Sequence, residues 1–368
     1  MRITFVLPGA NLSGGVRVVA IYAEKLVRLG HSVLVVHPWP PEPRLRQKFK
    51  SLLLGQGWPV RLDKSPTHFD GRNVERKILD QPRPLTDADV PDADVIVGTW
   101  WETTEWIANL SPSKGAKVYF AQGYEIFDFL PIDRVKATWA APMHKIVVSR
   151  WLANLARDEY GDTSVSLVPN AVDAQQFHAP VRDKQPFPSV GMLYSAAPIK
   201  GCDIGFRAIE LAKAAFPDLR LRLFGSDPPS PNLPLPAGAH FELHPPQHRL
   251  REIYASCDAW LFPSRNDGFG LPLLEAMACR TPIIATPTGA GPELTEAGAG
   301  FLVRMEDAED MAAAIRRICE MPGEKWRMLS ARAEQIALEH TWDRAAEQLV
   351  AALQLARERT LRGDFTRS

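Results

Sequence analysis

The chain has 368 residues, which is too many for one ordinary hydrophobic core, so we expect two domains. Hydrophobic residues make up 45% of it and charged residues 23%, proportions typical of a globular protein that exclude wholesale disorder. Basic and acidic side chains both number 43, so the net charge is zero. A nucleic-acid binder usually carries a basic excess, and we therefore expect no nucleic-acid partner.

The four cysteines show no short C-x-x-C spacing, so neither a zinc site nor a disulfide framework is indicated. We expect thiols that are buried or idle in a reducing compartment. The apolar run that follows Met1 is too short for a signal peptide or a membrane span. These features predict a cytoplasmic protein.

The first thirty-odd residues have the pattern of a β-loop-α-β unit. A short apolar run over Ile3–Leu7 predicts a buried parallel strand, and a turn-rich loop follows it. Helical spacing then covers Val16–Arg28 up to Gly30, and Ser32–Val36 predicts a second buried strand. This succession is typical of the start of a doubly wound sheet.

The alternation of strands and helices continues along the rest of the chain. Before a Pro- and charge-containing linker over residues 178–188, further strands are predicted at Asp94–Val97, Lys117–Ala121, Lys145–Val148 and Ser164–Val168, with a helix capped by Ser149 that extends to Tyr160. After the linker, strands are predicted at Val190–Tyr194, Leu219–Phe224, Ala259–Phe262, Pro282–Thr286 and Phe301–Val303. Helices are predicted at Asp203–Phe216, Arg249–Ser256, Leu271–Ala278, Asp307–Glu320, Glu324–His340 and from about Trp342 to Glu358.

The predicted fold class is therefore α/β, with two consecutive doubly wound, Rossmann-like domains. We place the first at residues 1–180 and the second at 181–341, and we expect the helix within 342–368 to return to the first. Ligands of such sheets bind at the carboxyl ends of the strands. We therefore expect the chemistry to lie between the domains, on loops from both.

The segment from Pro263 to Pro282 carries the strongest functional pattern. A buried strand ends, a turn with Gly268 and Gly270 follows, and a helix begins near Leu271. Unpaired backbone N–H groups at a helix start attract anions, and glycines let a ligand approach the backbone closely. Asp267 and Glu275, eight residues apart, could accept hydrogen bonds from sugar hydroxyls. The alternative is a helix that Asp267 merely caps, with Glu275 in solvent.

These residues and several others resemble a family 4 retaining glycosyltransferase with the GT-B architecture. The matching elements span nearly the whole chain: Gly14–Gly15, Ser149, Pro169–Asp173, Lys200–Gly201, the block from Asp267 to Glu275, Ala285–Thr286 and Glu293. The resemblance implies that Asp267 and the N–H groups of Gly268, Phe269, Gly270 and Leu271 hold the sugar and phosphates of the donor. It implies that Glu275 holds the ribose. The family normally has Glu where this chain has Asp267.

Lys200 lies beside Gly201 on a loop after a predicted strand. A lysine ammonium in that place is a compact charge suited to a diphosphate, although a solvated surface lysine is the alternative. The family commonly has an arginine at the position we assign to Met192, so one phosphate contact is expected to be missing. Arg265 or Arg17 could substitute for it.

Gly14 and Gly15, in the loop after the first strand, would let the donor phosphate or the acceptor pass close to backbone N–H groups. The loop is not G-x-G-x-x-G, and no acidic residue closes the second strand at Val36. Both absences argue against a dinucleotide. We expect no cofactor, and a nucleoside-diphosphate sugar as donor substrate.

The predicted strand that ends at Ala121 leads into Gln122, Tyr124 and Glu125. The segment resembles a subset that includes rhamnosyltransferases of bacterial surface polysaccharides, so these side chains are candidates to orient the acceptor or donor sugar; a polar loop is the alternative. Indole faces pack against the apolar faces of sugar rings. Trp100 and Trp101 follow a strand directly and are therefore our candidate acceptor contacts, with core packing as the alternative.

The segment from Arg44 to Leu54 is both basic and apolar. It could lie on the anionic inner membrane surface, where lipid-linked acceptors reside, or form an ordinary amphipathic helix.

The resemblance implies transfer of a sugar to a hydroxyl of a glycan or lipid-linked glycan, with retention of configuration. Lys200 and the helix start near Leu271 would stabilise the diphosphate leaving group, so we expect neither a metal nor a protein nucleophile. Two alternatives remain open. One is a nucleotide-sugar epimerase on the same architecture. The other is a non-catalytic subunit that binds a nucleotide sugar.

Overall fold

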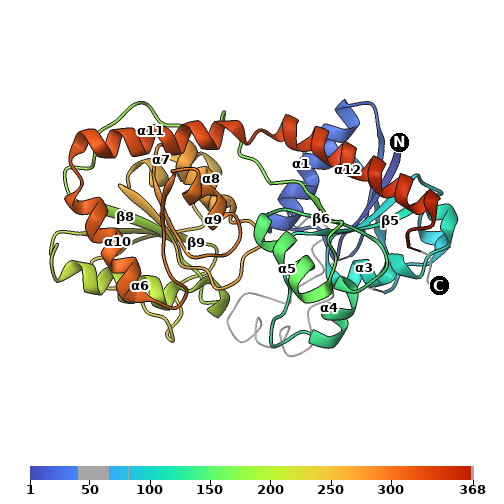
Figure 1. Ribbon diagram of the computed structural model, residues 1–368, viewed down its shortest axis with the longest axis horizontal. Helices are drawn as coiled ribbons and strands as arrows, with labels where there is room; N and C mark the ends of the chain where they lie inside the picture. The colour runs from blue at the N-terminus through green and yellow to red at the C-terminus, as the bar shows by residue number, and fades with distance from the viewer. Residues whose placement is uncertain (40–65, 82, 366–368) are drawn as a thin grey trace, which may run out of the picture. The chain divides into compact units, whose positions relative to one another are not determined.

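The computed structural model describes residues 1–39, 66–81 and 83–365, and it divides into two compact units (Figure 1). Unit 1 comprises Met1–Ile146, Ser164–Ser166 and the residues from Ala346 onward. Unit 2 comprises Val147–Thr163 and Leu167–Ala345. Each unit contains one sheet with helices on both faces, which confirms the predicted α/β fold class of two doubly wound domains.

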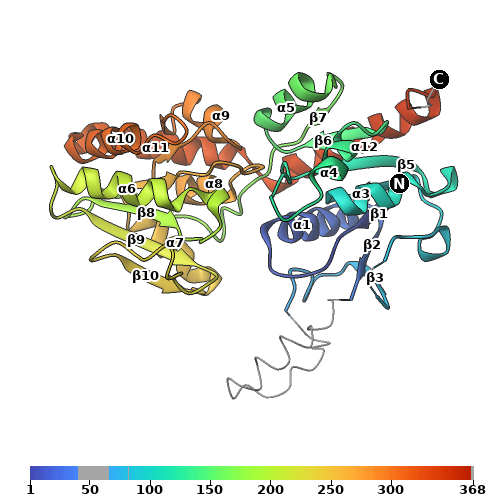
Figure 2. The ribbon, with the colours of Figure 1, turned by 90° about the horizontal axis from the view of Figure 1, so that it is seen from below.

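The sheet of the N-terminal half has the strand order β3-β2-β1-β4-β5-β6-β7 within the described residues. The chain runs outward from β1 to β2 and β3, then returns to the other side of β1 with β4 (Figure 2). β1 pairs in parallel with both neighbours, so that Ile3 lies opposite Val33 and Val95. The strands are β1 Arg2–Val6, β2 Ser32–Pro38, β3 Glu75–Leu79, β4 Val95–Gly98, β5 Ala116–Ala121, β6 His144–Val147 and β7 Ser166–Leu167.

The helices of unit 1 form where apolar residues recur at helical spacing. α1 buries a stripe that includes Val19, Tyr22 and Leu26, and it lies on the face of the sheet opposite α3 and α4 (Figure 1). The helices of this half are α1 Gly14–Arg28, α3 Trp101–Ala108, α4 Ile132–Trp139 and α5 Arg150–Tyr160. The predicted cap of α5 is confirmed, because Ser149 Oγ accepts a 3.3 Å hydrogen bond from the Leu152 N–H.

The sheet of unit 2 has the order β10-β9-β8-β11-β12-β13 in the described chain. The chain again moves outward, here from β8 to β9 and β10, before β11 returns to the opposite side of β8 (Figure 2). β8 pairs in parallel with both β9 and β11. The strands are β8 Ser189–Leu193, β9 Arg220–Gly225, β10 His240–Leu243, β11 Ala259–Phe262, β12 Ile283–Ala285 and β13 Gly300–Leu302.

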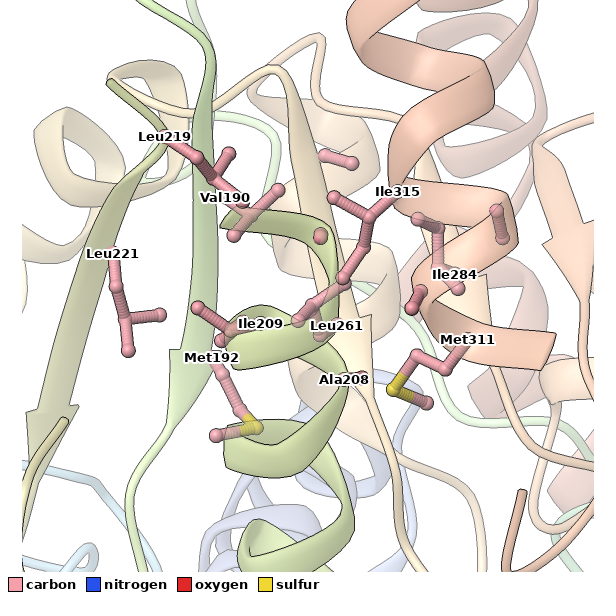
Figure 3. Packing of buried hydrophobic residues seen from close by; sticks show 14 of the residues in the cluster. Val190, Met192, Ala208, Ile209, Leu219, Leu221, Leu261, Ile284, Met311 and Ile315 are labelled. Atoms are coloured by element: carbon pink, nitrogen blue, oxygen red, sulfur yellow. The ribbon is translucent and has the colours of Figure 1, made fainter. Parts of the chain in front are cut away.

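Two helix layers cover the sheet of unit 2. α6 and α10 pack together on one face, and α7, α8 and α11 cover the other (Figure 1). Between the sheet and the first layer lies an aliphatic core in which Ile209 and Ile315 meet Leu261 (Figure 3). The helices are α6 Cys202–Lys213, α7 Gln247–Ala255, α8 Leu271–Ala278, α9 Gly291–Glu296, α10 Ala308–Glu320, α11 Gly323–Glu339 and α12 Trp342–Arg362. α12 begins in unit 2 and continues into unit 1 from Ala346.

Among the α-helices and β-strands of the described residues, five were not predicted. The edge strands β3 and β10 have only five and four residues, nearly all of them exposed or half-buried, because an edge strand has only one neighbour to pack against. The helices α3, α4 and α9 have only six to eight residues, too few for a clear helical period.

Candidate active site

The candidate donor-side site lies where the strand order of unit 2 reverses. β9 and β10 lie on one side of β8 and β11 on the other, so the strand order reverses between the loops that follow β8 and β11. Ligands of doubly wound sheets bind at this reversal. Lys200 is on the first of these loops, and Asp267 is on the second.

Lys200 and Asp267 form an ion pair, with 2.5 Å between Lys200 Nζ and Asp267 Oδ2. Both side chains are partly accessible, at 29% and 17%. The Asp267 N–H donates to Thr288 Oγ1 over 3.2 Å, which fixes the carboxylate's backbone to the loop after β12. The structure thus brings two of the three predicted catalytic residues into direct contact.

The two loops that carry this pair are joined by their backbones. The Arg265 N–H donates a 2.8 Å hydrogen bond to the Ile199 carbonyl. Gly201, which ends the turn after Lys200, has a φ of +63°, and a Cβ there would lie 2.0 Å from the Pro263 carbonyl oxygen. Only glycine fits that approach, so Gly201 sets the position of Lys200 relative to the β11 loop.

The start of α8 completes this side of the site. Gly270 precedes the helix with a φ of +85°, and the Leu273 N–H donates to its carbonyl over 2.9 Å. Pro272 has no N–H, so Leu271 and the residues before it supply the N–H groups at this end. Gly268 is buried, as is the Phe269 side chain, and the Phe269 carbonyl accepts from the Ala290 N–H. The predicted donor segment is therefore held from two neighbouring loops.

Glu275 lies on α8 and is buried. Its Oε2 accepts a 2.8 Å hydrogen bond from the Tyr254 hydroxyl of α7. The carboxylate is therefore oriented by the protein and does not lie in solvent. Tyr254 was not singled out in the sequence, because an aromatic residue on a helix ordinarily indicates core packing.

Met192, at the position where the family commonly has an arginine, is a core residue. Its side chain is 1% exposed and packs in the core beside Ile209, under α6 (Figure 3). Gly205 leaves room for it, since a Cβ at that position would lie 2.6 Å from Met192 Sδ. Arg265 pairs with Asp203 at 2.7 Å and with Glu306, and these contacts raise the pKa of its guanidinium. The Arg265 guanidinium is therefore held by these two carboxylates within the protein.

The reversal in unit 1 lies between β1 and β4, with β5 next in order. Trp100 and Gln122 lie in the loops after β4 and β5, whereas Gly15, which the sequence placed in the loop after β1, is the second residue of α1. A Cβ on Gly15 would lie 3.5 Å from Gln122 Nε2, so these two residues are neighbours at the edge. Both are half-buried and keep part of their surface accessible.

Tyr124 and Glu125 face inward from the same loop. Tyr124 packs edge-on against Trp139, with 5.7 Å between ring centroids. Glu125 is 2% exposed, and its Oε2 accepts a 2.8 Å hydrogen bond from the Tyr119 hydroxyl. Burial raises the pKa of the Glu125 carboxyl to about 8, against the hydrogen bond from Tyr119, which lowers it. Both side chains thus anchor the loop that presents Gln122.

The two adjacent tryptophans differ in exposure. Trp101 begins α3 and is 4% exposed, with the Arg134 guanidinium 4.9 Å from its ring centroid. Trp100 is half-buried and stacks on Phe127, with 6.4 Å between centroids. Phe127 in turn stacks on Phe129 at 5.5 Å. Neither phenylalanine was singled out in the sequence, where an aromatic residue near a helix start most often indicates core packing.

Three further features concern membrane contact and metal binding. The basic segment from Arg44 to Leu54 lies outside the described residues. Among the helices that are described, none is long and apolar enough to cross a membrane. Across the described ranges, no three His, Cys, Asp or Glu side chains are grouped to hold a metal ion.

Comparison with protein families identifies part of the chain. Residues 187–321 match the family model for glycosyl transferases group 1. A D-inositol 3-phosphate glycosyltransferase of Actinosynnema mirum is 39% identical over 117 residues, 31% of this chain and 28% of that protein. A GDP-mannose-dependent alpha-(1-6)-phosphatidylinositol dimannoside mannosyltransferase of Mycobacterium tuberculosis is 29% identical over 236 residues, 60% of either protein. The chain thus spans less than two thirds of the length of these relatives.

Solved structures match nearly the whole chain. Sucrose-phosphate synthase from Thermosynechococcus elongatus has a TM-score of 0.71 at 19% identity and covers 98% of this chain and 99% of its own. Anabaena HepE in complex with UDP and glucose has a TM-score of 0.72 at 17% identity, covering 96% and 99%. Residues 187–321 are therefore similar to the glycosyl transferases group 1 family, and the chain as a whole has the two-sheet GT-B fold.

Proposed function

We propose that this protein is a retaining glycosyltransferase that moves a sugar from a nucleoside-diphosphate sugar to an acceptor hydroxyl. The observation that carries the proposal is the Lys200–Asp267 pair beside the start of α8, in the region that matches the group 1 family. A cation, unpaired N–H groups and a carboxylate at one sheet edge suit a ligand that combines a diphosphate with a polyol.

Unit 2 would supply most of the donor contacts, and Gly15 of unit 1 stays a candidate donor contact. Lys200 Nζ and the N–H groups from Gly268 to Leu271 would contact the diphosphate, and Asp267 would accept hydrogen bonds from sugar hydroxyls. The buried, oriented carboxylate of Glu275 would accept from the ribose. The names of the similar proteins mention UDP and GDP-mannose, so UDP- and GDP-sugars are the donors to test first.

Catalysis would consist of positioning and charge stabilisation. As the bond from the sugar to the diphosphate breaks, negative charge develops on the leaving oxygen beside the Lys200 ammonium and the α8 N–H groups. The acceptor hydroxyl would attack the face from which the diphosphate departs, and its proton would pass to the departing diphosphate. In this scheme the protein needs neither a metal, a cofactor nor a nucleophile of its own.

The acceptor would lie on unit 1. Gln122 and Trp100 line its carboxyl edge, and this geometry supports an acceptor role for them. We propose a glycan or lipid-linked glycan of bacterial polysaccharide or glycoconjugate synthesis as the acceptor, and membership of the rhamnosyltransferase-like subset. The setting would be the cytoplasm, with peripheral contact at the inner membrane surface.

A thermal-shift panel of nucleotide sugars tests the proposal first, since a ligand that binds only the native state raises its melting temperature. The stabilising donor is then incubated with and without candidate acceptors. Transfer that Lys200→Ala lowers about 10²–10³-fold is the expected result. Conversion of the donor to its epimer without an acceptor would assign an epimerase instead. Donor binding with unchanged cellular glycan after Lys200→Ala and Glu275→Ala would assign a non-catalytic subunit.

A further inference from the structure

Three aromatic side chains of unit 1, which we call the aromatic row, extend outward from the candidate acceptor edge. Trp100, directly after β4, stacks on Phe127 with 6.4 Å between ring centroids and planes 29° apart. Phe127 stacks on Phe129 at 5.5 Å and 20°. Both phenylalanines lie in the loop after β5, which begins at Gln122. The row therefore starts at the reversal of the sheet and leads away from it.

The outer end of the row is an unusually exposed ring. Phe129 is 82% exposed, the largest fraction among the large hydrophobic side chains of the described chain. Its loop is nonetheless ordered by backbone hydrogen bonds, from the Phe127 N–H to the Glu125 carbonyl and from the Leu130 N–H to the Phe127 carbonyl. Because one face of Phe129 stacks on Phe127, the other face is the surface that a ligand can cover.

The charges around Phe129 decide which ligand fits. Asp128 precedes it and Asp133 lies in the first turn of α4, and both residues are exposed. The exposed Arg134 beside Asp133 is paired with Glu105, and Lys136 in the last turn of α4 is exposed as well. An anionic membrane repels carboxylates, and burying one among lipid chains costs about 2.5–3.5 kcal/mol on insertion scales. A carbohydrate suits both features, since its hydroxyls donate to carboxylates while its C–H face packs on an aromatic ring.

We propose that Phe129 and Asp128 form an outer subsite for a glycan acceptor longer than one sugar. The proposal rests on the proposed function, and it specifies the acceptor. Phe129 lies two stacking distances from Trp100, so one sugar ring cannot contact the outer faces of both. An oligosaccharide bound at Gln122 and Trp100 would place a further ring on Phe129. The outer subsite therefore selects acceptors by length and leaves donor binding unaffected.

The test is an array of bacterial surface oligosaccharides together with their component monosaccharides, probed with labelled full-length protein. We expect wild type to bind at least one oligosaccharide more tightly than its monosaccharides, and Phe129→Ala to lose about tenfold in that affinity. Asp128→Asn is expected to weaken the same interaction. Leu361→Ala is the matched control, because Leu361 is 77% exposed in the same unit but lies on α12, and it should change nothing.

Three results would overturn the outer subsite. They are wild type that binds no oligosaccharide above its monosaccharides, Phe129→Ala that binds like wild type, and Phe129-dependent sedimentation with vesicles of phosphatidylglycerol and phosphatidylethanolamine, which would assign a lipid surface. Thermal shifts with nucleotide sugars are measured on the same variants. A donor response kept by Phe129→Ala separates failure of this subsite from failure of the proposed function.

Discussion

The carboxyl edges of the two sheets carry different kinds of side chain. In unit 2 the edge consists of charged side chains on loops joined by backbone hydrogen bonds, with the Lys200–Asp267 pair at its centre. In unit 1 it consists of aromatic rings and one amide, with Trp100 stacked on Phe127 and Gln122 beside Gly15. The same topology therefore supports an electrostatic site in one unit and a stacking site in the other.

This difference fits the two substrates of the proposed reaction. The diphosphate is the same in every nucleoside-diphosphate donor, so charges and N–H groups at fixed positions can recognise it. Rigid loops keep these groups in position. Acceptors differ in ring, substituent and length, and aromatic faces tolerate such variation because they contact C–H surfaces of many shapes. Four predictions sharpen or break the comparison.

The largest expected effect comes from alanine substitutions at the two adjacent tryptophans, one of which should reduce stability and the other acceptor binding. Trp101→Ala removes a buried indole and is expected to cost about 3–5 kcal/mol of unfolding free energy. Trp100→Ala loses a half-exposed stack worth about 0.5–1.5 kcal/mol but should raise the KM for the acceptor. Urea unfolding and acceptor kinetics check both. Equal destabilisation by the two changes would remove Trp100 from the acceptor site and assign it to the core.

Lys200→Ala should lower the transfer rate about 10²–10³-fold, because the developing charge on the diphosphate loses its nearest cation. Lys213→Ala is the matched control, since Lys213 is a lysine of the same unit that donates to the Ala237 carbonyl. Steady-state transfer rates of the two variants provide the comparison. A Lys200→Ala enzyme as active as the Lys213→Ala enzyme would contradict the electrostatic account of unit 2.

Gly201→Ala tests whether the loops of unit 2 are as rigid as their contacts indicate. Gly201 and Gly238 both have positive φ, at +63° and +73°, but a Cβ on Gly238 meets nothing within 4 Å. Both alanines cost about 1–3 kcal/mol for the backbone conformation, and Gly201→Ala should cost a further ~1–3 kcal/mol for its collision with Pro263. Unfolding free energies in urea measure the difference. Equal values would show that the β11 loop moves aside freely.

Glu125→Gln should change how stability depends on pH. The folded carboxyl has a pKa near 8 and the unfolded one near 4.5, so between these values the unfolded chain loses a proton that the folded chain keeps. Stability therefore falls as pH rises through this window, by up to ~1.4 kcal/mol per pH unit for one group. Glutamine cannot ionise, and urea unfolding from pH 4.5 to 8 should show a flatter profile. An unchanged profile would mean that Glu125 is already ionised in the fold.

Sequence patterns predicted two doubly wound sheets, and they identified Lys200 and Asp267, which the structure places in contact. Buried parallel strands are continuous apolar runs, and glycine, proline and acidic residues at a helix start form a pattern that is visible without coordinates. Ser149 was correctly predicted to cap α5 for the same reason.

What the sequence could not supply were contacts between distant residues. Nothing in the chain order pairs Glu275 with Tyr254, or shows that Met192 packs beneath Gly205 in the core. Side-chain exposure cannot be read from the sequence either. Trp100 and Trp101 are the same residue type in adjacent positions, yet Trp100 is half-buried and Trp101 is buried. The edge strands β3 and β10 were missed because they are short and mostly exposed or half-buried, so neither contains a continuous apolar run.

The most direct test of the account is a crystal structure with the nucleoside-diphosphate sugar that stabilises the protein most. We predict the diphosphate within hydrogen-bond distance of Lys200 Nζ and of the N–H groups from Gly268 to Leu271, with a ribose hydroxyl on Glu275. A diphosphate bound elsewhere, with the Lys200–Asp267 pair intact at saturating ligand, would contradict it.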